Sequence, residues 1–374
     1  MKTKSGKLWI FVGLTLTLAA VLLLFGMTSA AAPPDDLPTA AHPKVKAAIA
    51  VQEAVTPNLM ALENILGTAV GMDDSGEAHL TVYVNEHGRE MAETVKSLPK
   101  TIKGLRVAVE VTEPFRAMAA AVTADAPHTA KQAAPIQLGT SGGWRLDLAN
   151  GYCCGGTLGS LVQVNGTQYV LSNYHVLEAD IVSGGNGHVA LTGDNVIQPG
   201  LIDVRCNAGG AQNVATLVKL SSLPGSNVDA AVAQVSPGMV RTDGSIIDIG
   251  MISGQTVTPA LKRAVKKSGR TTGLTRSTIS GLNATISVAY ENECAGGAAF
   301  TKTFTGQIVI ANKGSRFLNS GDSGSLLVED AANNPRAVGL LYAGSNTTAI
   351  ANPIGQVLAF LGSKLGGTAT MVGN

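Results

Sequence analysis

The string Gly321-Asp322-Ser323-Gly324-Ser325 contains a serine whose setting suits acyl-transfer chemistry. A serine between glycines is typical of a tight turn that exposes the hydroxyl and leaves backbone N–H groups free. Such amides can stabilise the negative charge that develops on a carbonyl oxygen during acyl transfer. We therefore predict that Ser323 is a nucleophile. The alternative is an ordinary turn, because the chain holds 44 glycines and short glycine-rich strings are common in it.

A serine hydroxyl is a poor nucleophile until a base removes its proton. The segment 139–374 holds two histidines, His175 and His188. His188 lies in GGNGHVAL beside a glycine-rich turn, where an exposed loop residue is expected. His175 lies in YVLSNYHVL directly after an apolar run, which places its imidazole at the end of a strand. We predict that His175 is the base, and a buried structural histidine is the alternative.

A third residue, Asp229, could orient the imidazole and stabilise its charged form. It lies in NVDAAVAQV, between a polar turn and an apolar strand. Charged side chains are rarely buried without a partner, and His175 would be a suitable one. The alternative is a turn aspartate bonded to its local backbone.

The sequence around these residues predicts many short strands. Short apolar or alternating runs separated by Gly, Asn and Ser predict an all-β barrel or sandwich over the 236 residues of 139–374. A short helix is expected after Pro353, over 354–361. Examples of the predicted strands are 157–164, 168–173, 228–235, 278–290, 304–311, 325–329 and 337–342.

The segment before residue 139 divides into four parts. Residues 1–32 have the basic, apolar and small-residue order of a secretory signal, with an uncleaved membrane anchor as the alternative because the apolar run is 20 residues long. Linkers are expected at 33–43 and 116–138, the second rich in Ala and Pro. Residues 44–115 predict a small α+β domain. Its expected elements are a helix over 44–66 interrupted or kinked at Pro57, a hairpin of strands 67–72 and 78–84, a helix over 88–98 and a strand over 105–112.

Charge and cysteine content exclude some classes of protein. The net charge is +1 and becomes −2 without the three lysines of residues 1–32, so no nucleic-acid partner is expected. Four cysteines in an exported chain permit one or two disulfides, whose pairing stays open. None has metal-ligand spacing with a nearby histidine, so we expect neither a metal nor another cofactor.

The order His, Asp, Ser, with each residue in its own string, resembles the chymotrypsin/trypsin-like serine peptidases. The string from Lys267, KSGRTTGLT, is similar to bacterial secreted members of the streptogrisin and α-lytic type. There is also similarity to a NARROW LEAF-type trypsin-like group of bacteria and plants. The resemblance covers residues 139–365 and rests on four ordered strings: Cys154-Gly-Gly-Thr-Leu-Gly-Ser-Leu-Val, Val170-Leu-Ser-Asn-Tyr-His-Val, Val228-Asp-Ala-Ala-Val-Ala and Gly321-Asp-Ser-Gly-Ser.

This resemblance implies two six-stranded antiparallel β-barrels of the chymotrypsin type, a short C-terminal helix and a serine-type endopeptidase domain over 139–374. The amides of Gly321 and Ser323 would form the oxyanion hole. Phe317 would be the floor of the primary specificity pocket and Gly344 part of its wall. An aromatic floor without a carboxylate suggests a preference for small or apolar side chains.

Two positions depart from the family pattern, and the activation site of many relatives is not identified. Val176 follows His175 where a cysteine is common, so Cys154 lacks its usual disulfide partner. Ser325 replaces the last glycine of Gly-Asp-Ser-Gly-Gly. In many relatives a new N-terminus pairs with the aspartate before the serine; Asp322 is present, but no clear activation site precedes the domain.

The expected partners are a protein or peptide substrate and, within the chain, residues 44–115 as a pro-segment or a permanent accessory domain. The expected location is extracytoplasmic, secreted or in the cell envelope, with membrane contact only if residues 1–32 remain as an anchor. Two alternative functions stay open: a non-catalytic binding module on the same fold, and an esterase that uses the same triad.

Overall fold

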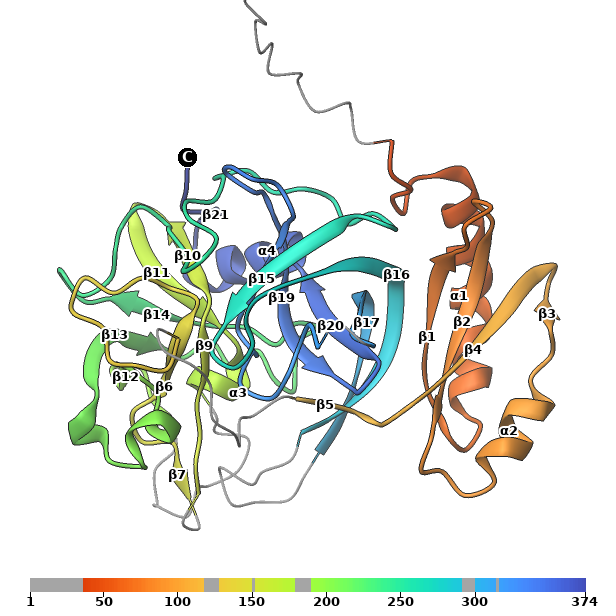
Figure 1. Cartoon of the computed structure of the whole chain (residues 1–374), viewed down its shortest axis with the longest axis horizontal. Coiled ribbons are helices and arrows are strands. Elements are labelled where there is room, and N and C mark those ends of the chain that lie inside the picture. The colour runs from red at the N-terminus through yellow and green to blue at the C-terminus, as the bar shows by residue number, and fades with distance from the viewer. Residues whose placement is uncertain (1–35, 118–127, 150–151, 179–189, 291–299, 314–315) are drawn as a thin grey trace, which may run out of the picture. The chain divides into compact units, whose positions relative to one another are not determined.

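The computed structural model describes residues 36–117, 128–149, 152–178, 190–290, 300–313 and 316–374. Most of the regular structure is β-strand, arranged in two large sheets with a short helix near the C-terminus (Figure 1). The mainly β class predicted from the sequence is therefore confirmed. The predicted signal or anchor, residues 1–32, lies outside the described residues.

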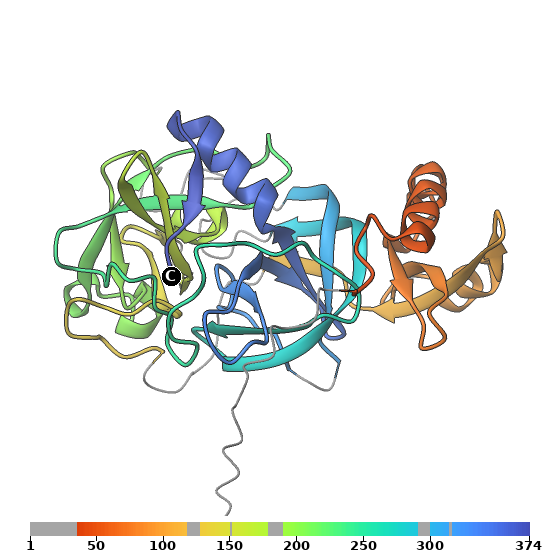
Figure 2. The same ribbon diagram turned by 90° about the horizontal axis from the view of Figure 1, so that it is seen from above.

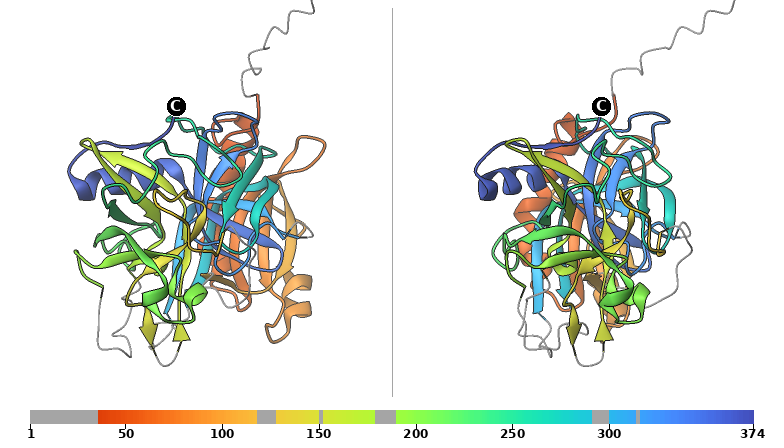
Figure 3. Two further views of the ribbon diagram at one scale, coloured as in Figure 1. Left: turned by 60° about the vertical axis from the view of Figure 1, so that its left-hand side comes forward. Right: turned by 90° about the vertical axis from the view of Figure 1, so that its left-hand side faces the viewer.

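The first sheet has eight strands, with β21 at one edge and β9 at the other. Its order is β21–β10–β11–β14–β13–β12–β6–β9, and only Gly159 separates β9 from β10 in the chain. Figure 3 shows most of these strands in yellow and green. Leu158, Leu161 and Val170 are among the buried side chains that fill it. Its strands are β6 (Thr140–Trp144), β9 (Gly156–Leu158), β10 (Ser160–Val164), β11 (Thr167–Ser172), β12 (Asn195–Gln198), β13 (Gln212–Val218), β14 (Ala231–Val235) and β21 (Ala369–Met371).

The second sheet contains a ring of six strands, because β15 pairs with β16 as well as with β18. The strand β16 is 18 residues long and continues past the ring as a hairpin with β17. The strand ranges given from the sequence cover β16 to β19 of this ring but not β15 or β20, and in the first sheet they leave out β6, β12, β13 and β21. The six strands are β15 (Ala264–Gly269), β16 (Gly273–Tyr290), β17 (Phe300–Ala311), β18 (Leu326–Glu329), β19 (Ala337–Gly344) and β20 (Thr348–Pro353).

The C-terminal helix α4 (Ile354–Leu365) begins directly after Pro353, as predicted. It ends at Gly366, whose left-handed φ of +71° suits a glycine C-cap. Figure 2 shows α4 lying beside strands of both sheets. One buried cluster joins them: Val357 and Leu361 of α4, Val162 and Leu171 of the first sheet, and Leu326 and Leu340 of the second.

The N-terminal α+β elements extend the second sheet. Strand β1 pairs with β16, and the order continues β1–β2–β4–β3. The predicted hairpin of β1 and β2 is confirmed. Pro57 lies inside the first helix without ending it. The elements are α1 (Pro43–Met60), β1 (Ile65–Met72), β2 (Ala78–Asn85), α2 (Met91–Ser97), β3 (Thr101–Ile102), β4 (Leu105–Thr112) and β5 (Phe115–Ala117).

The remaining elements are short: β7 (Leu148–Ala149), β8 (Tyr152–Cys153), the helix α3 (Tyr174–Leu177) and the 3-10 turns Leu201–Val204 and Ala208–Gly210. Cys153 forms a disulfide with Cys206, a pairing that the sequence left open, and Cys154 is also disulfide-bonded. Among the described residues, no helix combines the length and apolar character that a membrane span requires.

Candidate active site

The imidazole of His175 and the carboxylate of Asp229 are joined by a hydrogen bond of 2.6 Å between Nδ1 and Oδ2. His175 lies in α3, directly after β11, and Asp229 lies two residues before β14. Because β11 and β14 are paired neighbours in the first sheet, the strand ends bring the two side chains together. Asp229 is fully buried, and only 7% of the His175 side chain is exposed.

Further donors fix the Asp229 carboxylate. The Tyr174 amide donates to Oδ1 at 2.8 Å, and the Tyr290 hydroxyl donates to Oδ2 at 2.8 Å. The Asp229 amide donates to Asn352 Oδ1 at 2.9 Å. Tyr290 and Asn352 belong to the second sheet, so both contacts cross between sheets. Sequence reasoning missed them, because no local pattern marks a tyrosine at a strand end as a partner of a distant aspartate.

Ser323 lies in the turn before β18, between two glycines with left-handed backbones. Gly321 has φ +94° and Gly324 has φ +92°, conformations that strain other residues. The amides of Gly321 and Ser323 donate no hydrogen bond to another described residue. Neither amide is therefore engaged within the described part of the chain, and their role as oxyanion donors stays a prediction.

The Ser323 hydroxyl points to a main-chain oxygen in this structure. Its Oγ donates to the Tyr342 carbonyl at 3.2 Å, and His175 Nε2 is buried with no hydrogen-bond partner among the described residues. The structure thus brings His175 and Asp229 into contact but does not join Ser323 to His175. The chain segments that carry His175 and Ser323 nevertheless both lie next to Gly156. A Cβ atom added to Gly156 would be 2.6 Å from the Val176 side chain and 3.0 Å from the Ser323 carbonyl oxygen.

Asp322, directly before Ser323, is paired with a buried lysine. Its carboxylate lies 3.2 Å from Lys267 Nζ and accepts amide hydrogen bonds from Thr271, Thr272 and Asn319. Burial lowers the pKa of Lys267, and the charge of Asp322 opposes that shift. The KSGRTTG string therefore supplies a cation and amides that hold the base of the serine turn.

The two predicted pocket residues lie in different surroundings. Phe317 is fully buried in the hydrophobic core of the second sheet, with Ile310, Leu318 and Leu341 in the same cluster. Gly344 lines a pocket of about 770 Å³. Most other residues lining that pocket are polar, including Asn319, Ser320, Ser345 and Asn346, and Phe317 is not among them.

Strand β5 lies beside Gly344. It pairs antiparallel with β19, with Ala117 opposite Ala343 and Arg116 opposite Gly344, and parallel with the end of β16. Side chains just before β5 bind the same region: Thr112 Oγ1 donates to Ser345 Oγ at 2.7 Å, and Thr347 Oγ1 donates to Glu110 Oε1 at 2.7 Å. The N-terminal elements therefore cover the edge of β19 that includes Gly344.

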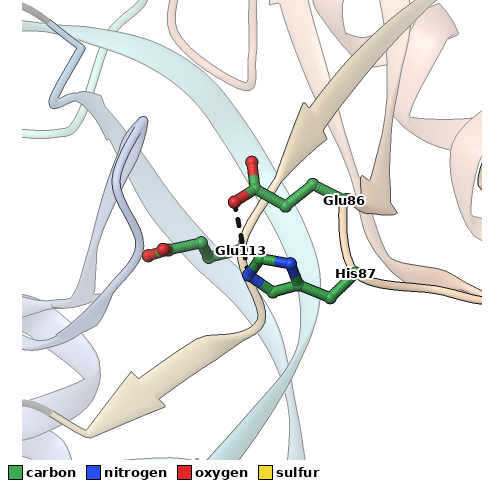
Figure 4. A group of neighbouring side chains, drawn as sticks. All are labelled: Glu86, His87 and Glu113. Atoms are coloured by element: carbon green, nitrogen blue, oxygen red, sulfur yellow. Dashed lines mark ion pairs between the residues drawn. The ribbon is translucent and has the colours of Figure 1, made fainter.

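Glu86, His87 and Glu113 are the group of possible metal ligands found among the described residues. Their ligand atoms all lie within 4.8 Å of one another, and Figure 4 shows the three side chains with the Glu86–His87 ion pair of 3.4 Å. The His87 side chain is 65% exposed, so this is a solvated surface cluster with no further feature that points to an ion.

The chain is similar to known proteins in part of its sequence and in its fold. Residues 225–352, about a third of the chain, match the family model described as the Nal1 C-terminal domain; this range includes Asp229 and Ser323 but not His175. No curated protein matches the chain. Similar solved structures include Thermobifida fusca protease A, at 18% identity and a TM-score of 0.41 over 64% of this chain and 99% of that one.

Two further structures have similar statistics. A glutamic acid-specific serine protease that uses a histidine triad in substrate binding is 16% identical, with a TM-score of 0.41 over 63% of this chain and 100% of that chain. Nocardiopsis protease is 17% identical, with a TM-score of 0.38 over 58% of this chain and 92% of that chain. The residue roles in this chain are argued from its own geometry.

Proposed function

We propose that this chain is a serine endopeptidase that cleaves peptide bonds through an acyl-enzyme. The observation that carries the proposal is the buried His175–Asp229 hydrogen bond, located near a glycine-flanked serine turn with two unengaged amides. This is the combination of base, orienting carboxylate and oxyanion donors that acyl transfer needs.

In the proposed mechanism the Ser323 hydroxyl turns from the Tyr342 carbonyl to His175 Nε2, which takes its proton as Ser323 Oγ attacks the substrate carbonyl. Catalytic hydrogen bonds often form only when substrate is bound, so the arrangement of the free chain is compatible with this step. The amides of Gly321 and Ser323 receive the oxyanion, and His175 returns the proton to the leaving amine. Water then releases the acyl group by the same steps.

The test is a comparison of the parent with Ser323→Ala, using casein cleavage and labelling by a fluorophosphonate. The parent should cleave and be labelled, and Ser323→Ala should do neither. Ser325→Ala is the control, because the Ser325 hydroxyl is buried and bonded to the Asp322 carbonyl; it should still be labelled. Equal cleavage by the parent and Ser323→Ala would refute the proposal.

One observation favours a non-catalytic binding module instead: Ser323 is fully buried and its hydroxyl is engaged by Tyr342. A folded parent that neither cleaves nor is labelled would support that function. An esterase with the same triad would be labelled and would cleave p-nitrophenyl esters but not casein.

The N-terminal elements are proposed as an intramolecular pro-segment of a secreted enzyme. The pairing of β5 with β19 supports this role, because an extended strand there covers an edge that a peptide could otherwise occupy. The signal-like residues 1–32 and the Cys153–Cys206 disulfide support an extracytoplasmic location. N-terminal sequencing of the protein recovered from the medium tests the pro-segment role and the location together. A start after residue 117 supports removal of the N-terminal elements, and a start near residue 33 supports a permanent domain.

A further inference from the structure

We infer that Tyr290 is a positioning residue for His175, acting through Asp229; this inference rests on the proposed function. The Tyr290 hydroxyl and His175 Nδ1 donate to the same carboxylate oxygen, Oδ2 of Asp229, at 2.8 and 2.6 Å. The second oxygen accepts the Tyr174 amide. A carboxylate held by three donors has a fixed plane, and that plane sets the orientation of the imidazole.

Tyr290 reaches the first sheet from the second. It is the last residue of β16, on the long hairpin with β17, and its partner across the hairpin is Phe300. Its ring stacks on Phe300 at 4.8 Å with an interplanar angle of 7°, and meets the His175 ring edge-on at 6.0 Å. The ring is buried, so packing fixes the hydroxyl that faces Asp229.

The electrostatics keep this hydroxyl a donor. Burial, and then the negative charge of Asp229, raise the pKa of Tyr290 well above its usual value, so the phenol stays protonated. Tyr342, also fully buried, is the other titratable group that acts on it, and its pKa is raised by burial and Asp229 as well. Among the described residues, no lysine or arginine forms an ion pair with Asp229, so neutral donors and His175 offset its charge.

A donor on Oδ2 draws negative charge away from the oxygen that His175 uses. Without it, Oδ2 is more basic and stabilises the imidazolium more strongly. The His175 ring should then titrate at higher pH, and the carboxylate loses one of the bonds that fix its plane. Both effects reduce the fraction of His175 that is neutral and correctly oriented as a base.

The test is Tyr290→Phe in the full chain, which keeps the stacked ring and removes one oxygen. We expect the titration midpoint of the His175 ring, followed by NMR, and the acid limb of the kcat/KM profile both to rise by about one pH unit. We expect kcat to fall about tenfold, with KM within a factor of two. Tyr83→Phe is the control: Tyr83 is a buried tyrosine of the same aromatic cluster, outside the site, and its loss should shift neither midpoint.

An unchanged His175 titration in Tyr290→Phe would overturn the inference, even if the variant were less stable, because a purely packing role predicts no such shift. If Tyr290→Phe does not fold, 3-fluorotyrosine at position 290 replaces it. This stronger donor should move the midpoint to lower pH, and no movement would overturn the inference. The NMR titration needs no turnover, so a parent without peptidase activity would refute the proposed function and leave this measurement interpretable.

Discussion

Lys267 Nζ lies 3.2 Å from the Asp322 carboxylate, and neither side chain is exposed to solvent. In many members of the peptidase family that the sequence resembles, a new N-terminus pairs with the aspartate that precedes the serine. Here the cation beside Asp322 is the Lys267 side chain, and three backbone amides also donate to the Asp322 carboxylate. The serine turn is therefore held by the KSGRTTG loop without a free α-amino group.

Lys267→Met should destabilise the protein strongly, because it leaves the Asp322 charge buried without a cation. Breaking a buried pair by removing one partner typically costs about 3–5 kcal/mol. Urea unfolding of the parent and the variant measures the loss. Lys96→Met is the matched control, since the Lys96–Glu93 pair is largely exposed and should change stability by less than about 1 kcal/mol. Similar losses in both variants would contradict the importance of the buried pair.

Asp229→Asn should lower turnover by about four orders of magnitude, because an amide cannot hold the His175 tautomer that a carboxylate holds. Measurement of kcat on casein-derived peptides checks this. The chain offers a matched control in a second His–Asp pair, His128 Nε2 to Asp248 Oδ2 at 3.0 Å. Asp248→Asn removes the charge of a partly exposed aspartate outside the site and should change kcat by less than twofold. An equal effect of the two substitutions would show that loss of a His–Asp pair acts only through folding.

The sequence predicted the fold class and the His175–Asp229 contact because both depend on local patterns. Short strands ended by Gly, Asn and Ser are visible in the sequence, and strands that end side by side bring their terminal residues together. Strands such as β12 and β15 were missed because they are short or carry buried lysines, so they lack a clear apolar pattern. Tyr290, Asn352 and β5 approach the site from positions 61 or more residues away from Asp229 in the chain, and only tertiary packing brings them there.

Arg116→Pro should increase the peptidase activity of the full-length chain. Arg116 lies opposite Gly344 of β19 and Ala289 of β16, so proline there removes a backbone donor from β5 and weakens its attachment between the two strands. A loss of about 1.4 kcal/mol from this contact corresponds to about tenfold in occupancy of the edge. Initial rates of casein cleavage, with intact mass confirming that the chain is full length, check the effect. Arg116→Ala keeps the N–H and should leave the rate nearer the parent's.

A fall in the activity of Arg116→Pro would point to a different role for β5. Strand β5 also pairs with Val288 and Ala289, next to Tyr290. A fall in activity for Arg116→Pro, with Arg116→Ala unaffected, would contradict the blocking role. It would instead indicate that β5 supports the end of β16 that carries Tyr290.

Asp147 should make the stability of the protein fall as pH rises. Burial raises the pKa of Asp147 to about 8, and its Oδ2 has no hydrogen-bond partner among the described residues. The unfolded chain releases this proton near its ordinary pKa of 3.8, whereas the folded chain keeps it to about pH 8. The stabilising contribution is therefore complete below about pH 4 and is lost as pH rises to about 8, by about 1.4 kcal/mol for each pH unit.

Asp147→Asn, which has the shape of the protonated acid and cannot ionise, removes this dependence. Urea unfolding at pH 5 and pH 8.5 should give a stability gain over the parent that is several kcal/mol larger at the higher pH. Asp74→Asn is the control, because the Asp74 side chain is fully exposed and its substitution should have the same small effect at both values. A gain for Asp147→Asn that is equal at pH 5 and pH 8.5 would mean that Asp147 ionises alike in the folded and unfolded chains, and that its buried carboxyl has access to water.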